Sequence, residues 1–335
     1  MNKIITTLFL AVFVFACKPK SADIQPIAEI ACKKLSYTYL NARTNETLAN
    51  ETYLYDKTGQ LIEFKTPFST IKYEYDAKGN LLKAIGYSKY QGSDIKWSET
   101  DYTYNANNQV IRQVSNVLNQ PGGVFNKEQE LIYEYYANGK MKKKTWFFYD
   151  FSKPYYFADY NEKGYEILSH FDGKPYRKTE YNEANLPYKQ IQYNLDNSNT
   201  VVDLYEYNSQ SMVTKSSQFV NGVLDIYSTN EYNSKGQQLN GMQYKGDGTL
   251  MSKSILEYTG ESYKISNYNG QNILTGYSIV EVQNGLIMKR TSYRDNKLSY
   301  YTVYVYDGHK NMIKEESFDD KSALTRRAEW TYQCD

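Results

Sequence analysis

Aromatic and polar residues alternate along most of the chain, from about residue 32 to its end. In Tyr73-Glu74-Tyr75, and again at Tyr133 and Tyr135, the tyrosines lie two positions apart. Successive side chains of a strand point to opposite faces, so the paired tyrosines share one face and Glu74 takes the other. No segment of this region shows apolar residues repeating with the period of a helix. The pattern therefore predicts an all-β chain.

A short motif repeats throughout this region. It reads Tyr-x-Tyr-Asp/Asn-x-x-Gly-x-Leu and is clearest at residues 53–61 and 73–81. The Asp or Asn opens a turn by bonding its own backbone, and the Gly that follows supplies a left-handed conformation. Each copy is therefore predicted to form a β-hairpin. Weaker copies, in steps of 20 to 31 residues, centre on Tyr104, Tyr135, Tyr160, Tyr181, Tyr207, Tyr232, Tyr258, Val282 and Tyr306, with a half-copy at 330–332.

The copies predict about 11 antiparallel β-hairpins, or roughly 22 strands, in one domain covering residues 32–335. This number exceeds what an open, twisted sheet carries without curling or closing. Ser211 and Ser262 replace the Gly of their copies, and we expect looser turns there. The connections at the other end of the hairpins, such as 119–123 and 150–154, are longer. Short turns are thus expected on one rim and long loops on the other.

The unit at residues 73–81, Tyr-Glu-Tyr-Asp-Ala-Lys-Gly-Asn-Leu, resembles the YD repeat of the Rhs family. That resemblance implies a continuous, spiralling β-sheet. The chain is also similar to lipoproteins described as having a porin-like, water-soluble β-barrel, a resemblance that implies a fold and no activity. Two architectures therefore remain open: a barrel or strongly curled sheet, and an open spiral of the Rhs kind.

Cys32 and Cys334 bracket the repeats and bear on this choice. Two cysteines that flank a domain in an oxidising compartment are a candidate disulfide. A disulfide needs its α-carbons within about 7 Å, whereas roughly 22 strands about 4.8 Å apart would separate the ends of a flat sheet by about 100 Å. Pairing therefore requires a strand at 35–40 to meet one at 328–333. This favours the closed barrel, whereas free thiols would favour the open spiral.

The N-terminal segment is typical of a cleaved secretory signal. Lys3 precedes an apolar and threonine run at 4–15, which is too short to cross a bilayer as a mature helix. The ending Val-Phe-Ala-Cys resembles a bacterial lipobox, which implies that residues 1–16 are removed and that Cys17 is the lipid attachment site, holding the protein to a membrane. Residues 17–31 are expected to form a tether. The residue after Cys17 is Lys rather than Asp, which favours the outer membrane and leaves open its periplasmic face or the cell surface.

Composition excludes several function classes. Tyrosine accounts for 37 of 335 residues, and Lys plus Arg at 39 balance Asp plus Glu at 38, so the basic excess of a nucleic-acid binder is missing. No sequence motif of a serine hydrolase, zinc protease or phosphate-binding loop is present. We therefore expect no enzymatic activity, no cofactor and no nucleic-acid partner. His170 and His309 are expected in exposed turn regions. Residues 196–199 lack the glycine and terminal glutamate of a calcium loop, so no metal site is expected.

The best candidates for a ligand-binding surface are the aromatic residues Trp146, Phe148, Tyr149, Tyr155 and Tyr156. Consecutive aromatics cannot all face one side of a strand, so some of these rings are exposed or pack beneath the loop. Exposed rings stack on sugars or partner proteins, whereas packed rings would form a local core. Two function classes remain: an envelope lipoprotein that binds or scaffolds a glycan or a partner protein, and an outer-membrane or pore-like barrel with a lipid-modified end.

Overall fold

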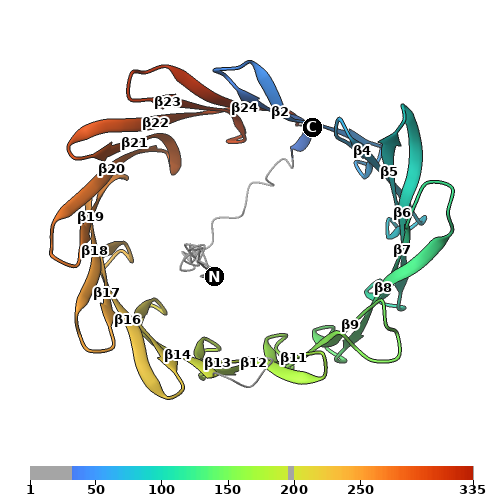
Figure 1. Ribbon diagram of the computed structural model, residues 1–335, viewed down its shortest axis with the longest axis horizontal. Helices are drawn as coiled ribbons and strands as arrows, with labels where there is room; N and C mark the ends of the chain where they lie inside the picture. Colours follow the sequence, from blue (N-terminus) through green and yellow to red (C-terminus); the bar gives the residue numbers. More distant parts are fainter. Residues whose placement is uncertain (1–31, 195–199, 335) are drawn as a thin grey trace, which may run out of the picture.

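The computed structural model describes residues 32–194 and 200–334, which form one closed antiparallel sheet of 24 strands (Figure 1). The predicted all-β barrel is thereby confirmed, and the open spiral is excluded. Among the described residues, no helix is long and apolar enough to cross a membrane. The predicted signal at 1–16, Cys17 and the tether at 17–31 lie outside the described residues.

The strands follow one another around the ring in chain order. They are β1 (Lys33–Asn41), β2 (Glu46–Tyr55), β3 (Leu61–Lys65), β4 (Ser69–Tyr75), β5 (Leu81–Tyr90), β6 (Ser93–Tyr104), β7 (Val110–Leu118), β8 (Phe125–Tyr135), β9 (Met141–Phe148), β10 (Tyr156–Tyr160), β11 (Glu166–Phe171), β12 (Lys174–Tyr181), β13 (Pro187–Tyr193), β14 (Thr200–Tyr207), β15 (Val213–Val220), β16 (Val223–Tyr232), β17 (Gln238–Lys245), β18 (Leu250–Thr259), β19 (Ser262–Asn269), β20 (Leu274–Gln283), β21 (Leu286–Arg294), β22 (Lys297–Tyr306), β23 (Met312–Asp319) and β24 (Leu324–Gln333).

The sequence undercounts the strands because it counts only hairpins. β2 to β23 make up the hairpins that the repeats predict, while β1 and β24 belong to no complete copy. These two strands pair with each other, with Lys33 opposite Gln333 and Asn41 opposite Arg326. The predicted meeting of the first and last strands is therefore confirmed, and it forms a seam that leaves neither strand with an open edge.

The repeat turns have the predicted chemistry. In the turn after β4, Asp76 Oδ1 accepts backbone hydrogen bonds from Lys78 at 2.8 Å and Asn80 at 2.9 Å. Gly79 occupies the left-handed position with φ +88°. We call the end of the barrel that carries these turns the turn rim, and the opposite end the loop rim.

Two turn predictions are wrong. Ser211 adopts φ 65°, and its N–H donates to Asn208 at 3.0 Å, so this turn is as tight as the glycine turns. Ser262 lies within β19 opposite Thr259, because β18 and β19 are joined by a shorter turn that contains Gly260. The loop rim also differs from expectation, since several of its connections are as short as Gln91-Gly92, between β5 and β6.

In the part of the chain that the structure describes, the barrel wall is one sheet thick and has no central core. For 24 strands, a spacing of about 4.8 Å and a tilt of about 40° give a ring on the order of 45 Å across, which side chains cannot fill. Within the described ranges, the buried hydrophobic side chains are Leu118, Ala158, Val280 and Ala328. Backbone pairing and cross-strand contacts therefore hold the wall together.

The second tyrosine of the repeat extends the sheet beyond its backbone ladder. Between β5 and β6 the paired residues end at Lys83 and Asp101 on the side of the turn rim. Leu81 lies beyond this pair, and its carbonyl accepts a hydrogen bond from the Tyr104 hydroxyl at 2.8 Å. We call this bond a tyrosine clasp. It satisfies a backbone acceptor at the point where two hairpins separate.

The clasp recurs around the barrel with the same geometry. In each case the acceptor is a carbonyl near the turn-rim end of the preceding strand, and the donor–acceptor distance is 2.7 to 3.0 Å. Burial raises the pKa of Tyr135, as it does for the other clasp tyrosines, so the donating proton is retained. The pairs are Tyr55–Lys34, Tyr75–Leu61, Tyr104–Leu81, Tyr135–Val110, Tyr181–Glu166, Tyr207–Pro187, Tyr232–Val213 and Tyr306–Ile287.

Removing a single hydroxyl tests the clasp. Tyr104→Phe keeps the ring but leaves the Leu81 carbonyl without its donor, so we expect the free energy of unfolding to fall by about 1 kcal/mol in a denaturant titration. Tyr90→Phe is the matched control because Tyr90 is 48% exposed and makes no clasp. It should leave the unfolding free energy nearly unchanged, and equal losses in the two variants would contradict a stabilising role for the clasp.

Candidate functional site

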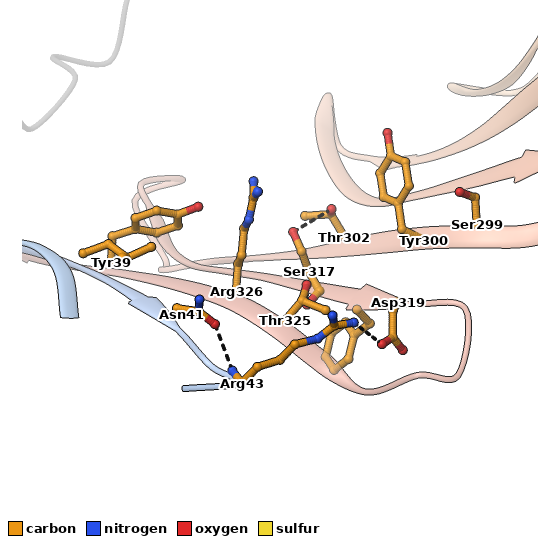
Figure 2. A pocket seen from close by; sticks show the side chains of 12 residues that line it. Tyr39, Asn41, Arg43, Ser299, Tyr300, Thr302, Ser317, Asp319, Thr325 and Arg326 are labelled. Carbon is orange, nitrogen blue, oxygen red and sulfur yellow. Dashed lines mark hydrogen bonds and ion pairs between the residues drawn. The ribbon is translucent and has the colours of Figure 1, made fainter. Parts of the chain in front are cut away.

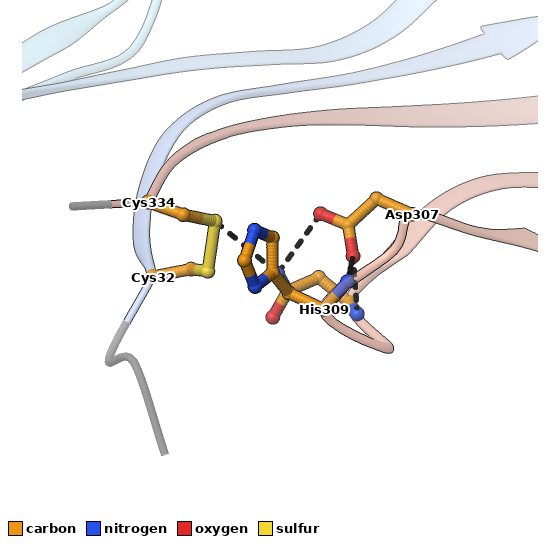
Figure 3. The surroundings of a disulfide bond; sticks show 5 residues. Cys32, Asp307, His309 and Cys334 are labelled. Atoms are coloured by element: carbon orange, nitrogen blue, oxygen red, sulfur yellow. Dashed lines mark hydrogen bonds between the residues drawn. A yellow bond between two sulfur atoms is a disulfide. The ribbon is translucent and has the colours of Figure 1, made fainter. Parts of the chain in front are cut away.

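The seam is crosslinked at the turn rim. Cys32, just before β1, and Cys334, just after β24, form a disulfide with their α-carbons 4.2 Å apart (Figure 3). The disulfide predicted between Cys32 and Cys334 is therefore confirmed. The bond joins residues 302 positions apart and covalently closes the ring beside the β1–β24 ladder.

His309 lies next to the disulfide, in the turn between β22 and β23 (Figure 3). The ligand atoms of Cys32, Cys334 and His309 lie within 4.8 Å of one another. Cysteine binds metals as the thiolate, so the oxidised pair offers no thiolate ligand. Asn311 Nδ2 instead contacts Cys334 Sγ at 3.7 Å. Residues 196–199, the other metal candidate, lie outside the described residues.

The two histidines differ from each other. His309 is exposed in a turn, as predicted. His170 was expected in an exposed turn region, and this is wrong: it lies within β11, half-buried, with its ring stacked on Phe157 at 4.2 Å. The β10–β11 ladder places these two residues opposite each other, and this pairing explains the contact.

Four of the five aromatic candidates come together at the loop rim. Trp146 contacts Tyr155 at 5.2 Å between ring centroids, and Phe148 contacts Tyr149 at 4.1 Å. Tyr155 extends the group to Phe171 of β11 at 4.5 Å. We call Trp146, Phe148, Tyr149, Tyr155 and Phe171 the aromatic patch. Phe171 was not among the residues predicted from the sequence, although the hairpin predicted for the copy centred on Tyr160 would have placed it opposite Tyr156.

The patch is neither a buried core nor a set of isolated rings. Tyr149 is 67% exposed, and the other four side chains are half-buried. Tyr149 adopts φ 56°, and its hydroxyl donates to Glu128 at 3.1 Å. Tyr156, the fifth candidate, instead directs its hydroxyl to Glu166 at 3.4 Å. The patch therefore presents partly exposed ring surfaces suited to stacking.

A polar groove, unforeseen in the sequence, lies at the loop rim across the seam (Figure 2). It has a volume of about 700 Å³ and is lined by side chains from β1, β22, β23 and β24, among them Tyr39, Thr302 and Arg326. Arg43 and Asp319 form an ion pair at its edge. We call it the seam groove. Its walls come from both ends of the chain, so no local sequence signal could reveal it.

Strong ion pairs lie elsewhere on the wall and involve different side chains. Hydrogen bonds from Lys83 and Lys96 hold the pKa of Glu99 below its usual value. Burial of Glu316 opposes its ionisation, but Lys314 at 2.9 Å and Arg327 at 2.7 Å outweigh it, so the pKa is also lowered. These carboxylates are ionised and matched by cations, the arrangement of a structural ion pair.

Comparison with known proteins yields similarities of shape alone. No protein-family model and no curated protein matches the chain. The structure titled TcdB2-TccC3-TEV is 10% identical with a TM-score of 0.34, and the match covers 88% of this chain and 20% of that one. A porin-like protein from Bacteroides uniformis is 12% identical with a TM-score of 0.33, covering 66% and 92%. A porin-like protein from Bacteroides vulgatus is 9% identical with a TM-score of 0.20, covering 90% and 99%.

The chain thus spans about a fifth of the TcdB2-TccC3 chain that it matches. Identities and TM-scores this low leave the function to be argued from the residues of this chain.

The disulfide gives a direct test of seam closure. In the chain expressed from Ser21, which lacks Cys17, we expect no free thiol after unfolding without reductant. Reduction should lower the free energy of unfolding by about 2–5 kcal/mol, because the bond closes a loop of 302 residues. A Cys32→Ser, Cys334→Ser variant, unaffected by reductant, is the control. Two free thiols per unreduced chain would contradict the crosslink.

Proposed function

We propose that this protein is a non-enzymatic lipoprotein of the outer membrane that binds a glycan or an envelope protein at the loop rim. The observation that carries the proposal is the aromatic patch, in which Trp146, Phe148 and Tyr155 contact one another and Tyr149 is largely exposed. Contiguous, partly exposed rings on a rigid wall are typical of surfaces that stack on sugars or on protein side chains.

The loop that carries the patch is held in place on both sides. Asp150 Oδ1 accepts the Ser152 N–H at 2.9 Å, and Lys153 pairs with Asp172 of the neighbouring connection at 2.8 Å. The Tyr155 N–H donates to Trp146 O at 2.9 Å. A fixed loop lowers the entropy lost on binding, which favours a preformed recognition surface.

The polarity of the wall favours a barrel in water over a membrane-spanning one. A transmembrane barrel needs an apolar band on its outer face. At mid-strand in β7 and β8, Glu130 is paired with Arg112 and Lys127 on one face. On the other face the Ser115 hydroxyl bonds that of Thr100 at 2.9 Å. Whichever face is outward, polar groups lie where lipid would require apolar ones.

The proposed mode of action is binding without turnover. The patch offers ring faces and one hydroxyl engaged by Glu128, groups that recognise a ligand by stacking and hydrogen bonding. Lipid attachment at Cys17 would hold the barrel at the membrane, and 17–31 would act as the tether. This mode needs no cofactor.

A glycan array and a pull-down from envelope extract test the proposed site. We expect the triple variant Trp146→Ala, Phe148→Ala, Tyr155→Ala to bind at least about tenfold more weakly, because each removed ring is worth about 1 kcal/mol or more of stacking. The control is Trp97→Ala with Tyr90→Ala, two exposed aromatics on β5 and β6. Undiminished binding by the triple variant would exclude the patch as the site.

The lipid anchor is tested by mass spectrometry of the mature N-terminus. We expect acylated Cys17 as the first residue and the protein in the membrane fraction, with Cys17→Ala shifting it to the soluble fraction. An unmodified N-terminus at another residue would contradict the anchor. Circular dichroism of the variant would show that the barrel still folds.

A further inference from the structure

The seam groove contains a cation that has no partner among the described residues. Arg326 of β24 is exposed, and its strand neighbours across the sheet are Ser317 and Asn41, neither of which is charged. The next residue, Arg327, points to the opposite face, where it contacts Glu316 at 2.7 Å. The two adjacent arginines therefore differ: Arg327 is neutralised by Glu316, whereas no carboxylate in the described residues pairs with Arg326.

The groove continues along the loop rim into a second hollow. This hollow has a volume of about 490 Å³, and Ser299 and Tyr300 of β22 line both spaces. It contains another exposed guanidinium, that of Arg294 at the end of β21, which has no carboxylate partner in the described ranges. The two hollows together therefore form an extended polar channel with a free guanidinium in each part.

An exposed ring lies between the two guanidiniums. Tyr300 is 47% exposed, and Figure 2 shows its ring and the Arg326 side chain rising from the same side of the sheet. Hydroxyl groups surround them: Thr302 bonds Ser317 at 3.0 Å on this face. Among the described residues that line either hollow, Asp319 is the one acid, and Arg43 neutralises it.

We propose that this channel binds an acidic oligosaccharide whose sugar rings carry carboxylates. A guanidinium presents paired N–H donors that match a carboxylate, and an exposed tyrosine ring offers a stacking surface for a sugar. A small anion would meet only one of the two arginines, whereas a chain with a carboxylate on successive sugars reaches both. Surrounding hydroxyls suit the remaining sugar hydroxyls. The site is separate from the aromatic patch, which lies on the opposite side of the ring (Figure 1).

The experiment compares a short oligogalacturonate with its methyl ester, binding each to the full-length protein in detergent by calorimetry. The ester keeps the sugar rings and removes the charge, so it isolates the carboxylates. We expect the acid to bind, the ester to bind at least about tenfold more weakly, and affinity for the acid to fall with salt. Failure of the acid to bind, or equal binding of the two ligands, would overturn the proposal.

Variants locate the site. Arg326→Ala with Arg294→Ala should weaken acid binding by about a hundredfold or more, since a hydrogen bond to a charged group is worth about 1.5–3 kcal/mol. Arg326→Lys should weaken binding less than Arg326→Ala does, because lysine keeps the positive charge but lacks the paired N–H donors of the guanidinium. Lys57→Ala, which removes an exposed cation from the turn between β2 and β3 at the opposite rim, is the control and should leave binding unchanged. A loss in Lys57→Ala equal to that in the double variant would overturn the site assignment.

The two proposed sites are distinguished by the triple variant of the aromatic patch, which should bind the acid as the unmodified protein does. If that variant alone loses the acid, the seam proposal fails and the patch is the site. If the arginine variants alone lose it, the seam proposal stands irrespective of what the patch binds.

Discussion

The hydrogen bond from a tyrosine hydroxyl to a strand carbonyl is the interaction on which this barrel depends. A wall one sheet thick has almost no core, so an unsatisfied backbone group is not offset by burial elsewhere. At the turn rim the ladders between hairpins stop short, as at Lys83 and Asp101. In the clasp from Tyr104 to Leu81, for example, the tyrosine hydroxyl donates to the Leu81 carbonyl, which lies beyond the last pair of the ladder. This requirement explains why the second tyrosine is retained in so many copies of the repeat.

Further contacts tie neighbouring turns to each other. Gln60 Nε2 donates to Gly79 O at 3.1 Å, and Gln109 Nε2 donates to Gly139 O at 2.7 Å. With the clasps and the disulfide, these bonds join many of the neighbouring hairpins along the turn rim. The closed sheet also pairs both end strands, which removes the exposed edges through which sheets aggregate.

The two rims therefore have different roles. The turn rim repeats one type of turn and carries the disulfide, whereas the loop rim varies from two-residue turns to the long connection after β9. Both candidate sites lie at the loop rim: the aromatic patch at β9–β11 and the seam groove at β21–β24 and β1. Binding surfaces on the variable rim leave the disulfide and the tyrosine clasps undisturbed, because neither candidate site contains any of those residues.

The sequence by itself determined the local structure. Its tyrosine spacing and Asp/Asn turns predicted the hairpins, the all-β class and the meeting of the two ends, because these follow from contacts within a copy and from the position of the cysteines. The tight turn at Ser211 and the stacking of His170 on Phe157 could not be predicted in this way. Both depend on the backbone conformation and strand register, which composition does not encode. The seam groove was decided only by the tertiary structure. Tyr39 and Arg326 become neighbours when the ring closes, so their shared site has no signature along the chain.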